Sequence, residues 1–145
     1  MAVEAKRVMS GTFGEVWLDN DYVAEATKSQ AKVEFNKEEI KMCGTWFTDT
    51  KVVGCTGKGS MTLKKVNTRM GLKLKDYIKN KKDLRFTLIS KLDDPDAWGA
   101  ERCKLTGVSV DDLTLFDWEA QTPGEVEVPF TFTGYEYLDT IKPQK

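Results

Sequence analysis

The sequence predicts a mainly β fold, an antiparallel β-sandwich or barrel with one flanking α-helix. The first observation is the regular alternation of residues 124–138, which places apolar and polar side chains on opposite faces of a strand. The second is that shorter segments with the same period of two recur along the chain. The third is that only one stretch carries apolar residues at helical spacing. A sheet with a single amphipathic helix packed on it accounts for all three observations.

The first half of the chain supplies four of the predicted strands. Residues 14–26 predict two short strands around an Asp19-Asn20-Asp21 turn, because Asp and Asn tolerate the backbone of tight turns. Alternating apolar and polar residues predict a third strand over 31–36 and a fourth over 60–64.

The predicted helix follows, with Thr68 available as its N-cap. Its apolar stripe consists of Met70, Leu74, Tyr77 and Ile78. Five lysines lie within residues 73–82 and raise the alternative of phosphate or nucleic-acid binding. Because Tyr77 lies on the apolar stripe and not beside the lysines, the solvated face of a helix explains them better.

Two later segments contain a glycine at which the alternation changes phase. A fifth strand is predicted over 84–88, and residues 103–110 follow with a phase change at Gly107. Residues 113–115 predict a short strand or turn. Within 124–138 the phase changes again at Gly134, which predicts a bulge or strand break there.

The alternation of residues 124–138 places one apolar row on a single face, formed by Val126, Val128, Phe130 and Phe132. Pro129 interrupts the polar row and lacks an amide hydrogen, so its strand should be an edge or carry a local break. The exposed edge is a liability that the protein must cover or pair.

Residues 36–59 lack clear periodicity, and we predict a long loop there. This segment carries aliphatic and aromatic side chains, namely Ile40, Met42, Trp46, Phe47, Val52 and Val53. A solvated loop that exposes all of them would promote association. Two interpretations stay open: the loop folds back on its own domain, or it buries this surface in another molecule.

Bulk properties exclude several classes of function. The net charge of -1 leaves no electrostatic footprint for nucleic acid or an anionic membrane, and no apolar run approaches a membrane span. The chain has no histidine, which excludes His-dependent triads and His-ligated zinc. We expect no catalytic residues, no metal and no cofactor, and three reduced cysteines. Asp93-Asp94-Pro95-Asp96 lacks the pattern of a calcium loop and predicts a solvated turn.

Several blocks in order along nearly the whole chain resemble the tail tube proteins of PBSX-type phages and related prophage particles. These blocks are residues 10–19, 32–39, 59–67, 86–102, 113–120 and 127–132. The resemblance implies one tail tube domain over residues 1–145, with an N-terminal arm over about 1–13. It also implies stacked hexameric rings that form the inner tube of a phage tail or phage-tail-like bacteriocin.

The resemblance also implies a set of partners and contacts. The partners are further copies of the chain, together with tail sheath, tape-measure and baseplate proteins, with DNA only as passing cargo. The subunit-interface candidates are Met9, Thr12, Phe13, Ile40, Met42, Trp46, Phe47 and Pro129. The N-terminus lacks the apolar stretch of a signal peptide, so synthesis in the host cytoplasm is expected. The alternative is a monomeric β-barrel binding module, acting on single-stranded nucleic acid.

Overall fold

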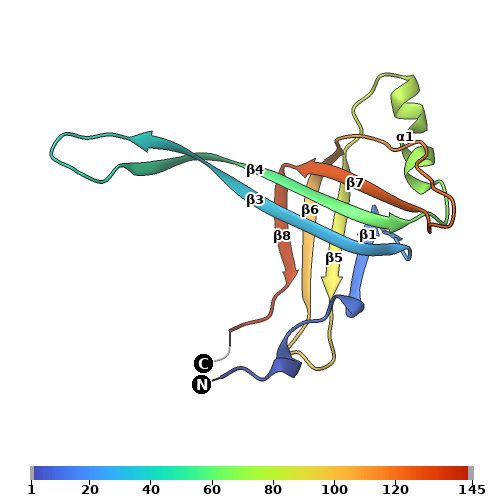
Figure 1. Cartoon of the computed structure of the whole chain (residues 1–145), viewed down its shortest axis with the longest axis horizontal. Coiled ribbons are helices and arrows are strands. Elements are labelled where there is room, and N and C mark those ends of the chain that lie inside the picture. Colours follow the sequence, from blue (N-terminus) through green and yellow to red (C-terminus); the bar gives the residue numbers. More distant parts are fainter. Residues whose placement is uncertain (1, 144–145) are drawn as a thin grey trace.

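The computed structural model describes residues 2–143 and shows two antiparallel sheets that share one strand (Figure 1). The first sheet has the order β2-β1-β5-β6-β8, and the second has the order β6-β7-β4-β3. The strands are β1 (Gly14–Leu18), β2 (Asp21–Tyr22), β3 (Ala26–Ile40), β4 (Asp49–Lys64), β5 (Phe86–Leu92), β6 (Glu101–Val110), β7 (Glu125–Phe132) and β8 (Gly134–Asp139). With the helix α1 (Arg69–Lys79) beside them, the predicted fold class is confirmed.

The core lies between the two sheets, and β7 contributes its largest side chains. Val128, Phe130 and Phe132 are buried, whereas Glu125 and Glu127 alternate with them and are exposed. The predicted alternation of this segment is therefore confirmed. Apolar burial of this kind is the main stabilising contribution to a fold of this size. The remaining buried hydrophobic residues are Val16, Leu18, Val23, Met61, Leu63, Met70, Phe86, Leu88, Leu105 and Val108.

Two glycines of β4 allow the β7 rings to lie directly over its backbone. Gly57 is opposite Phe132, and Gly59 is opposite Phe130, in the antiparallel ladder. A Cβ atom at Gly57 would lie 2.5 Å from the ring of Phe132, and one at Gly59 would lie 2.6 Å from the ring of Phe130. A side chain at either position would displace a core phenylalanine, so the glycines are packing residues here.

Both predicted phase changes occur where β6 passes from one sheet to the other. Gly107 has a left-handed φ of 63°, and the β5–β6 register shifts beside it. Gly134 pairs with Thr106 and is the first residue of β8, separated from the end of β7 by Thr133 alone. The predicted strand break at Gly134 is confirmed. Together these breaks let β6 pair with β8 in the first sheet and with the end of β7 in the second.

Pro129 lies in a strand that is interior only in part. β7 pairs with β4 along its whole length, but β6 reaches only Phe130 and Thr131. The Pro129 carbonyl accepts a hydrogen bond from the Asp111 amide, at 2.9 Å, where the chain leaves β6. The Pro129 nitrogen lies on the same side of the strand as its carbonyl, beyond the last residue that pairs with β6. The absence of an amide hydrogen there therefore removes no ladder hydrogen bond. The strand is thus locally an edge at Pro129.

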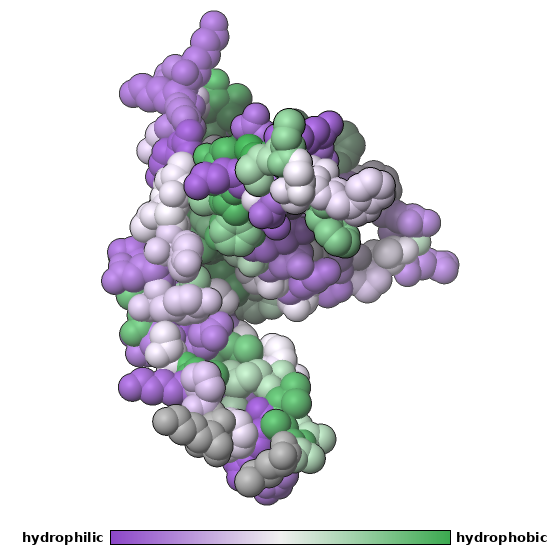
Figure 2. Space-filling model, turned by 90° about the vertical axis from the view of Figure 1, so that its left-hand side faces the viewer, coloured by the Kyte–Doolittle hydropathy of each residue, from purple (hydrophilic) through white to green (hydrophobic). Residues whose placement is uncertain are grey.

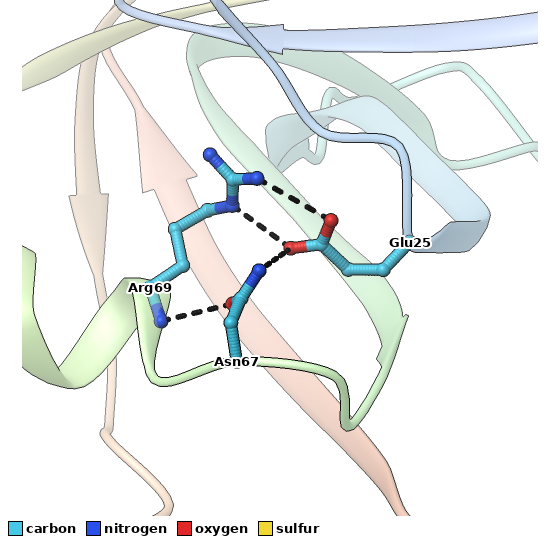
Figure 3. A network of polar contacts seen from close by, with 3 residues as sticks. All are labelled: Glu25, Asn67 and Arg69. Atoms are coloured by element: carbon cyan, nitrogen blue, oxygen red, sulfur yellow. Dashed lines mark hydrogen bonds and ion pairs between the residues drawn. The ribbon is translucent and has the colours of Figure 1, made fainter.

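The helix α1 is tied to the sheets by ion pairs at its N-terminal half. Arg69 makes a forked contact with Glu25, with Nε to Oε1 at 2.8 Å and Nη2 to Oε2 at 3.3 Å (Figure 3). The Asn67 side chain donates to Glu25 at 3.3 Å and accepts from the Arg69 amide at 3.0 Å. Thr68 is the N-cap residue of the helix, as predicted, but its side chain makes no capping hydrogen bond. The Asn67 side chain, one residue earlier, accepts a hydrogen bond from the free Arg69 amide instead.

Residues 36–59, predicted as a long loop, are instead mostly β-strand. β3 and β4 pair from Ala26–Leu63 out to Ile40–Asp49, so only residues 41–48 form the connecting loop. One residue, Val53, is extra where the register shifts between Asn36 and Lys37. The prediction failed because alternation reports a buried face, and the outer part of this hairpin has none.

Candidate assembly surface

The β3–β4 hairpin extends well beyond the body of the protein. β4 pairs with β7 only as far as Gly57, so residues 34–56, which we call the arm, have no third strand among the described residues. Figure 1 shows the arm projecting from the two sheets as a twisted two-stranded ribbon. From Glu34 to Ile40 the strand adds seven residues, or about 23 Å of reach. A two-stranded ribbon of this kind is marginal alone in water.

The arm carries an unusual concentration of exposed apolar side chains. Trp46 is 95% exposed and Phe47 is 85% exposed at the tip. The other exposed hydrophobic residues of the arm are Phe35, Ile40, Met42, Val52 and Val53. Figure 2, viewed from the side toward which the arm projects, shows hydrophobic residues standing among hydrophilic ones. Exposed apolar groups in this number mark an interaction surface.

The two faces of the hairpin differ in chemistry where the arm leaves the core. On one face Glu34 lies 3.6 Å from Lys32 and 3.7 Å from Lys58, an exposed network of opposite charges. On the opposite face Phe35 pairs with Cys55, next to Val33, which packs against the core. The core-facing apolar row of β3 therefore extends onto the arm at Phe35, which is 64% exposed. The structure thus excludes the interpretation in which this segment folds back on its own domain.

The N-terminal segment lies against the β5–β6 loop. It contains two short 3-10 turns, Ala5–Arg7 and Gly11–Phe13. The Ser10 amide donates to Asp94 Oδ2 at 2.9 Å, and the Asp96 amide donates to Asp94 Oδ1 at 2.9 Å. Asp94 is 6% exposed, so the predicted solvated turn at residues 93–96 is wrong at this residue. Burial of the Asp94 carboxylate is tolerated because its two oxygens accept hydrogen bonds from two backbone amides.

A further apolar surface lies between β6 and β7, and none of its residues is among the predicted interface candidates. Residues 111–124 form an irregular segment where a short strand or turn was predicted. Leu115 is 76% exposed, Phe116 is 79% exposed and Trp118 is 80% exposed. We call these three residues the aromatic loop cluster. The signal that identifies it is the one used for residues 36–59, namely aromatic residues in a segment without periodicity.

The predicted interface candidates occupy three separate places in the structure. Ile40, Met42, Trp46 and Phe47 lie together at the outer end of the arm and are exposed. Thr12 and Phe13 are exposed and Met9 is half-buried, all in the N-terminal segment. Pro129 is half-buried in β7 and borders a surface depression lined by Asp112, Asp117, Glu125 and Glu127. Only the arm residues form a cluster.

The thiols and acidic groups suggest no further chemistry. Cys43 and Cys55 are free and exposed on the arm, and Cys103 is half-buried in β6. Burial raises the pKa of the Cys103 thiol, and the nearby Glu101 raises it further, so this thiol is a poor nucleophile. Within residues 2–143 no group of three or more His, Cys, Asp or Glu side chains is placed to hold a metal ion. None of the helical residues described forms a segment long and apolar enough to cross a bilayer.

Comparison with known proteins identifies the family. Residues 1–139 match the family model described as phage tail tube protein. The chain is 35% identical over 143 residues to the phage-like element PBSX protein XkdM of Bacillus subtilis (strain 168), with 97% of each chain covered.

Two solved structures are similar in fold. The cap of the anti-feeding prophage has a TM-score of 0.70 at 11% identity, covering 97% of this chain and 95% of the other. A chain of the PVC sheath–tube complex, an extracellular contractile injection system, has a TM-score of 0.69 at 9% identity, covering 94% and 95%. The chain therefore belongs to the phage tail tube protein family and is a structural component of a phage tail or tail-like particle.

Proposed function

We propose that this chain assembles into stacked hexameric rings that form the inner tube of a phage tail or of a phage-tail-like bacteriocin. The observation that carries this proposal is the arm, residues 34–56, which leaves its own core and exposes Trp46 and Phe47 almost completely. A monomer gains nothing from holding such residues in water. A ring or stack covers them with the next subunit, and the same contact repeats at every copy.

Two further surfaces serve as additional contacts in this proposal. The N-terminal segment carries Met9, Thr12 and Phe13. The hydrogen bond from the Ser10 amide to Asp94 holds this segment in place before assembly. Pro129 marks the part of β7 that β6 leaves uncovered. Mixed charge close to neutrality lets many copies approach one another without strong repulsion.

The assembled tube has the partners that a tail requires. Sheath, tape-measure and baseplate proteins bind its outside, lumen and end, and DNA is at most a passing cargo. The subunit is made in the cytoplasm of the bacterial host and performs no catalysis. Its role is to provide a rigid conduit built from many modest interfaces.

Replacing both tip aromatics by aspartate tests the proposal. The Trp46→Asp, Phe47→Asp double variant should retain its β-sheet circular dichroism, because both residues are exposed and contribute nothing to the core. Tube growth, followed by light scattering and negative-stain electron microscopy, should be abolished because a buried contact would then hold two unpaired carboxylates.

The control is Ile78→Asp on α1. Ile78 is 60% exposed, so this variant replaces an exposed apolar side chain by aspartate away from the arm, and its tubes should form normally. Unchanged tubes from the double variant would contradict the proposed role of the arm. A persistent monomer of the native chain that binds oligonucleotides in a salt-sensitive manner would support the alternative binding module.

A further inference from the structure

We infer that the aromatic loop cluster, Leu115, Phe116 and Trp118, is the docking site for the arm tip of a second copy of this chain. This inference rests on the proposed self-assembly and names the partner surface within it. Three tryptophans of the described structure are exposed, and Trp46 at 95% and Trp118 at 80% are far more exposed than Trp98 at 47%. Trp46 and Trp118 each lie among other exposed large apolar side chains. Tryptophan is the side chain most often found at the energetic centre of protein interfaces.

The two regions lie at opposite ends of the molecule (Figure 1). Thr114 and Leu115 border the depression formed by Lys64, Lys65 and the start of α1, which is the base of the hairpin. The tip lies at the other end of β4, whose sixteen residues from Asp49 to Lys64 span about 50 Å. The tip of one chain therefore cannot reach its own loop cluster. Surfaces at opposite ends are the requirement for a head-to-tail contact that repeats from copy to copy.

The aromatic loop cluster is held outward by anchors on both sides. Leu113 packs against the core on the N-terminal side of the cluster. On the C-terminal side the Gly124 carbonyl accepts a hydrogen bond of 2.8 Å from the Lys65 amide. Between these two anchors the side chains of Leu115, Phe116 and Trp118 lie in solvent. The cluster is thus presented in advance to a partner, which lowers the entropic cost of binding.

Charge disfavours a second loop as the occupant and permits the arm. Residues 111–119 contain four carboxylates and no basic residue, namely Asp111, Asp112, Asp117 and Glu119. Symmetric pairing of two such loops would bring eight negative charges together, which is unfavourable. Residues 37–51 of the arm instead carry three lysines and three acidic residues. Lys37, Lys41 and Lys51 can therefore face the loop carboxylates while the aromatic groups pack together.

Disulfide trapping tests the contact, because Cys43 provides a natural thiol at the arm tip. In a chain with Asp117→Cys and Cys55→Ser, mild oxidation of assembled particles should join the tip of each copy to the loop of the next. Non-reducing electrophoresis should then show a ladder of dimers, trimers and larger species. Each chain carries one thiol at its arm tip and one in its loop, so it can be joined to two neighbours. Disulfides form only between residues whose Cβ atoms come within about 4.5 Å, so the ladder reports direct contact.

Two controls make the result specific. Adding Cys43→Ser to the same chain should abolish the ladder, and moving the new thiol to the exposed end of α1 with Lys79→Cys should give none. Trp46→Ala and Trp118→Ala should each raise the concentration needed for assembly, and the double variant should be less than additive if the two residues share one interface.

The outcomes separate this inference from the proposed function. Normal tubes without a ladder that depends on Asp117→Cys would overturn the inference and leave tube formation intact. A ladder that stops at dimers would also overturn it, since head-to-tail contacts continue beyond two copies. Complete absence of assembly in the native chain would overturn the proposed function, and this inference with it.

Discussion

At the residue scale, the contact among Glu25, Asn67 and Arg69 decides how the hairpin base and the helix are joined (Figure 3). Glu25 precedes β3 directly, and its side chain is 7% exposed against 26% for Arg69. The hydrogen bonds from Arg69 lower the pKa of the Glu25 carboxyl below its ordinary value. Burial opposes this shift, and hydrogen bonds from the Glu25 backbone and from Asn67 add to it. The same pair raises the pKa of Arg69. The ionised pair therefore stabilises the fold.

The sign of this pKa shift predicts how stability depends on pH. Because the folded pKa of Glu25 is depressed, its stabilisation is fully present above the ordinary glutamate pKa of 4.5 and is lost as pH falls through the lower folded value. Glu25→Gln keeps the shape but removes the charge, and we expect it to cost roughly 1–3 kcal/mol at pH 7. Urea unfolding at pH 7 and at pH 3 should show the native chain and the variant converging at the lower pH. Parallel pH profiles would contradict this prediction.

At the element scale, the shared strand β6 makes one sandwich out of two sheets. The passage from one sheet to the other occurs at Gly107, opposite Thr133 and one residue from the Thr106–Gly134 pair. The Thr133 amide donates to the Thr106 carbonyl at 3.1 Å across this corner. Both glycines could be selected from the sequence because each one reverses the parity of the apolar residues around it. That both breaks meet at one corner depends on strand pairing, which parity does not report.

Gly107→Ala should therefore destabilise the fold. Its φ of 63° is unfavourable for alanine, and the added Cβ would be in steric conflict with Thr133 Oγ1. We expect a loss of at least about 1–2 kcal/mol in the free energy of unfolding, measured by chemical denaturation. Gly11→Ala is the matched control, because no atom lies within 4 Å of its Cβ position, and it should change stability by less than about 0.5 kcal/mol. Equal effects of the two substitutions would contradict the prediction that position 107 requires glycine.

At the scale of the whole molecule, the body and the arm have separate roles. The buried hydrophobic residues all lie outside residues 34–56, so the core is complete without the arm. In the proposed assembly the arm extends from the body toward neighbouring copies. A folded body with an incompletely covered projection is the arrangement expected of a subunit that finishes its burial in an assembly.

Removing the arm should separate folding from assembly. In a shortened chain, residues 36–54 are replaced by Asn-Gly, which favours a two-residue hairpin turn between Phe35 and Cys55. The thermal unfolding midpoint should change by only a few degrees, because no core contact is lost. Sedimentation velocity should show a monomer under conditions in which the full chain forms rings or tubes. Loss of cooperative unfolding would show instead that the arm is part of the folding unit.

The sequence by itself determined the fold class, the buried face of β7, the turn at Asp19-Asn20-Asp21 and both strand breaks. Each of these rests on a local cause, namely side-chain alternation against a buried face or the backbone freedom of particular residues. Asp19 and Asn20 indeed have left-handed φ values of 49° and 72°.

Only the tertiary structure decided where residues 36–59 and 111–124 lie. The arm has no buried face in its own chain, so no alternation marks its strands. At Gly57 and Gly59, just inside the body, glycine replaces the apolar side chains that would mark the core face. The aromatic content of both segments was visible in the sequence, but their position was not. Whether Trp46 and Trp118 point into a core or into solvent depends on which strands lie beside them, and that is set by contacts between residues far apart in the chain.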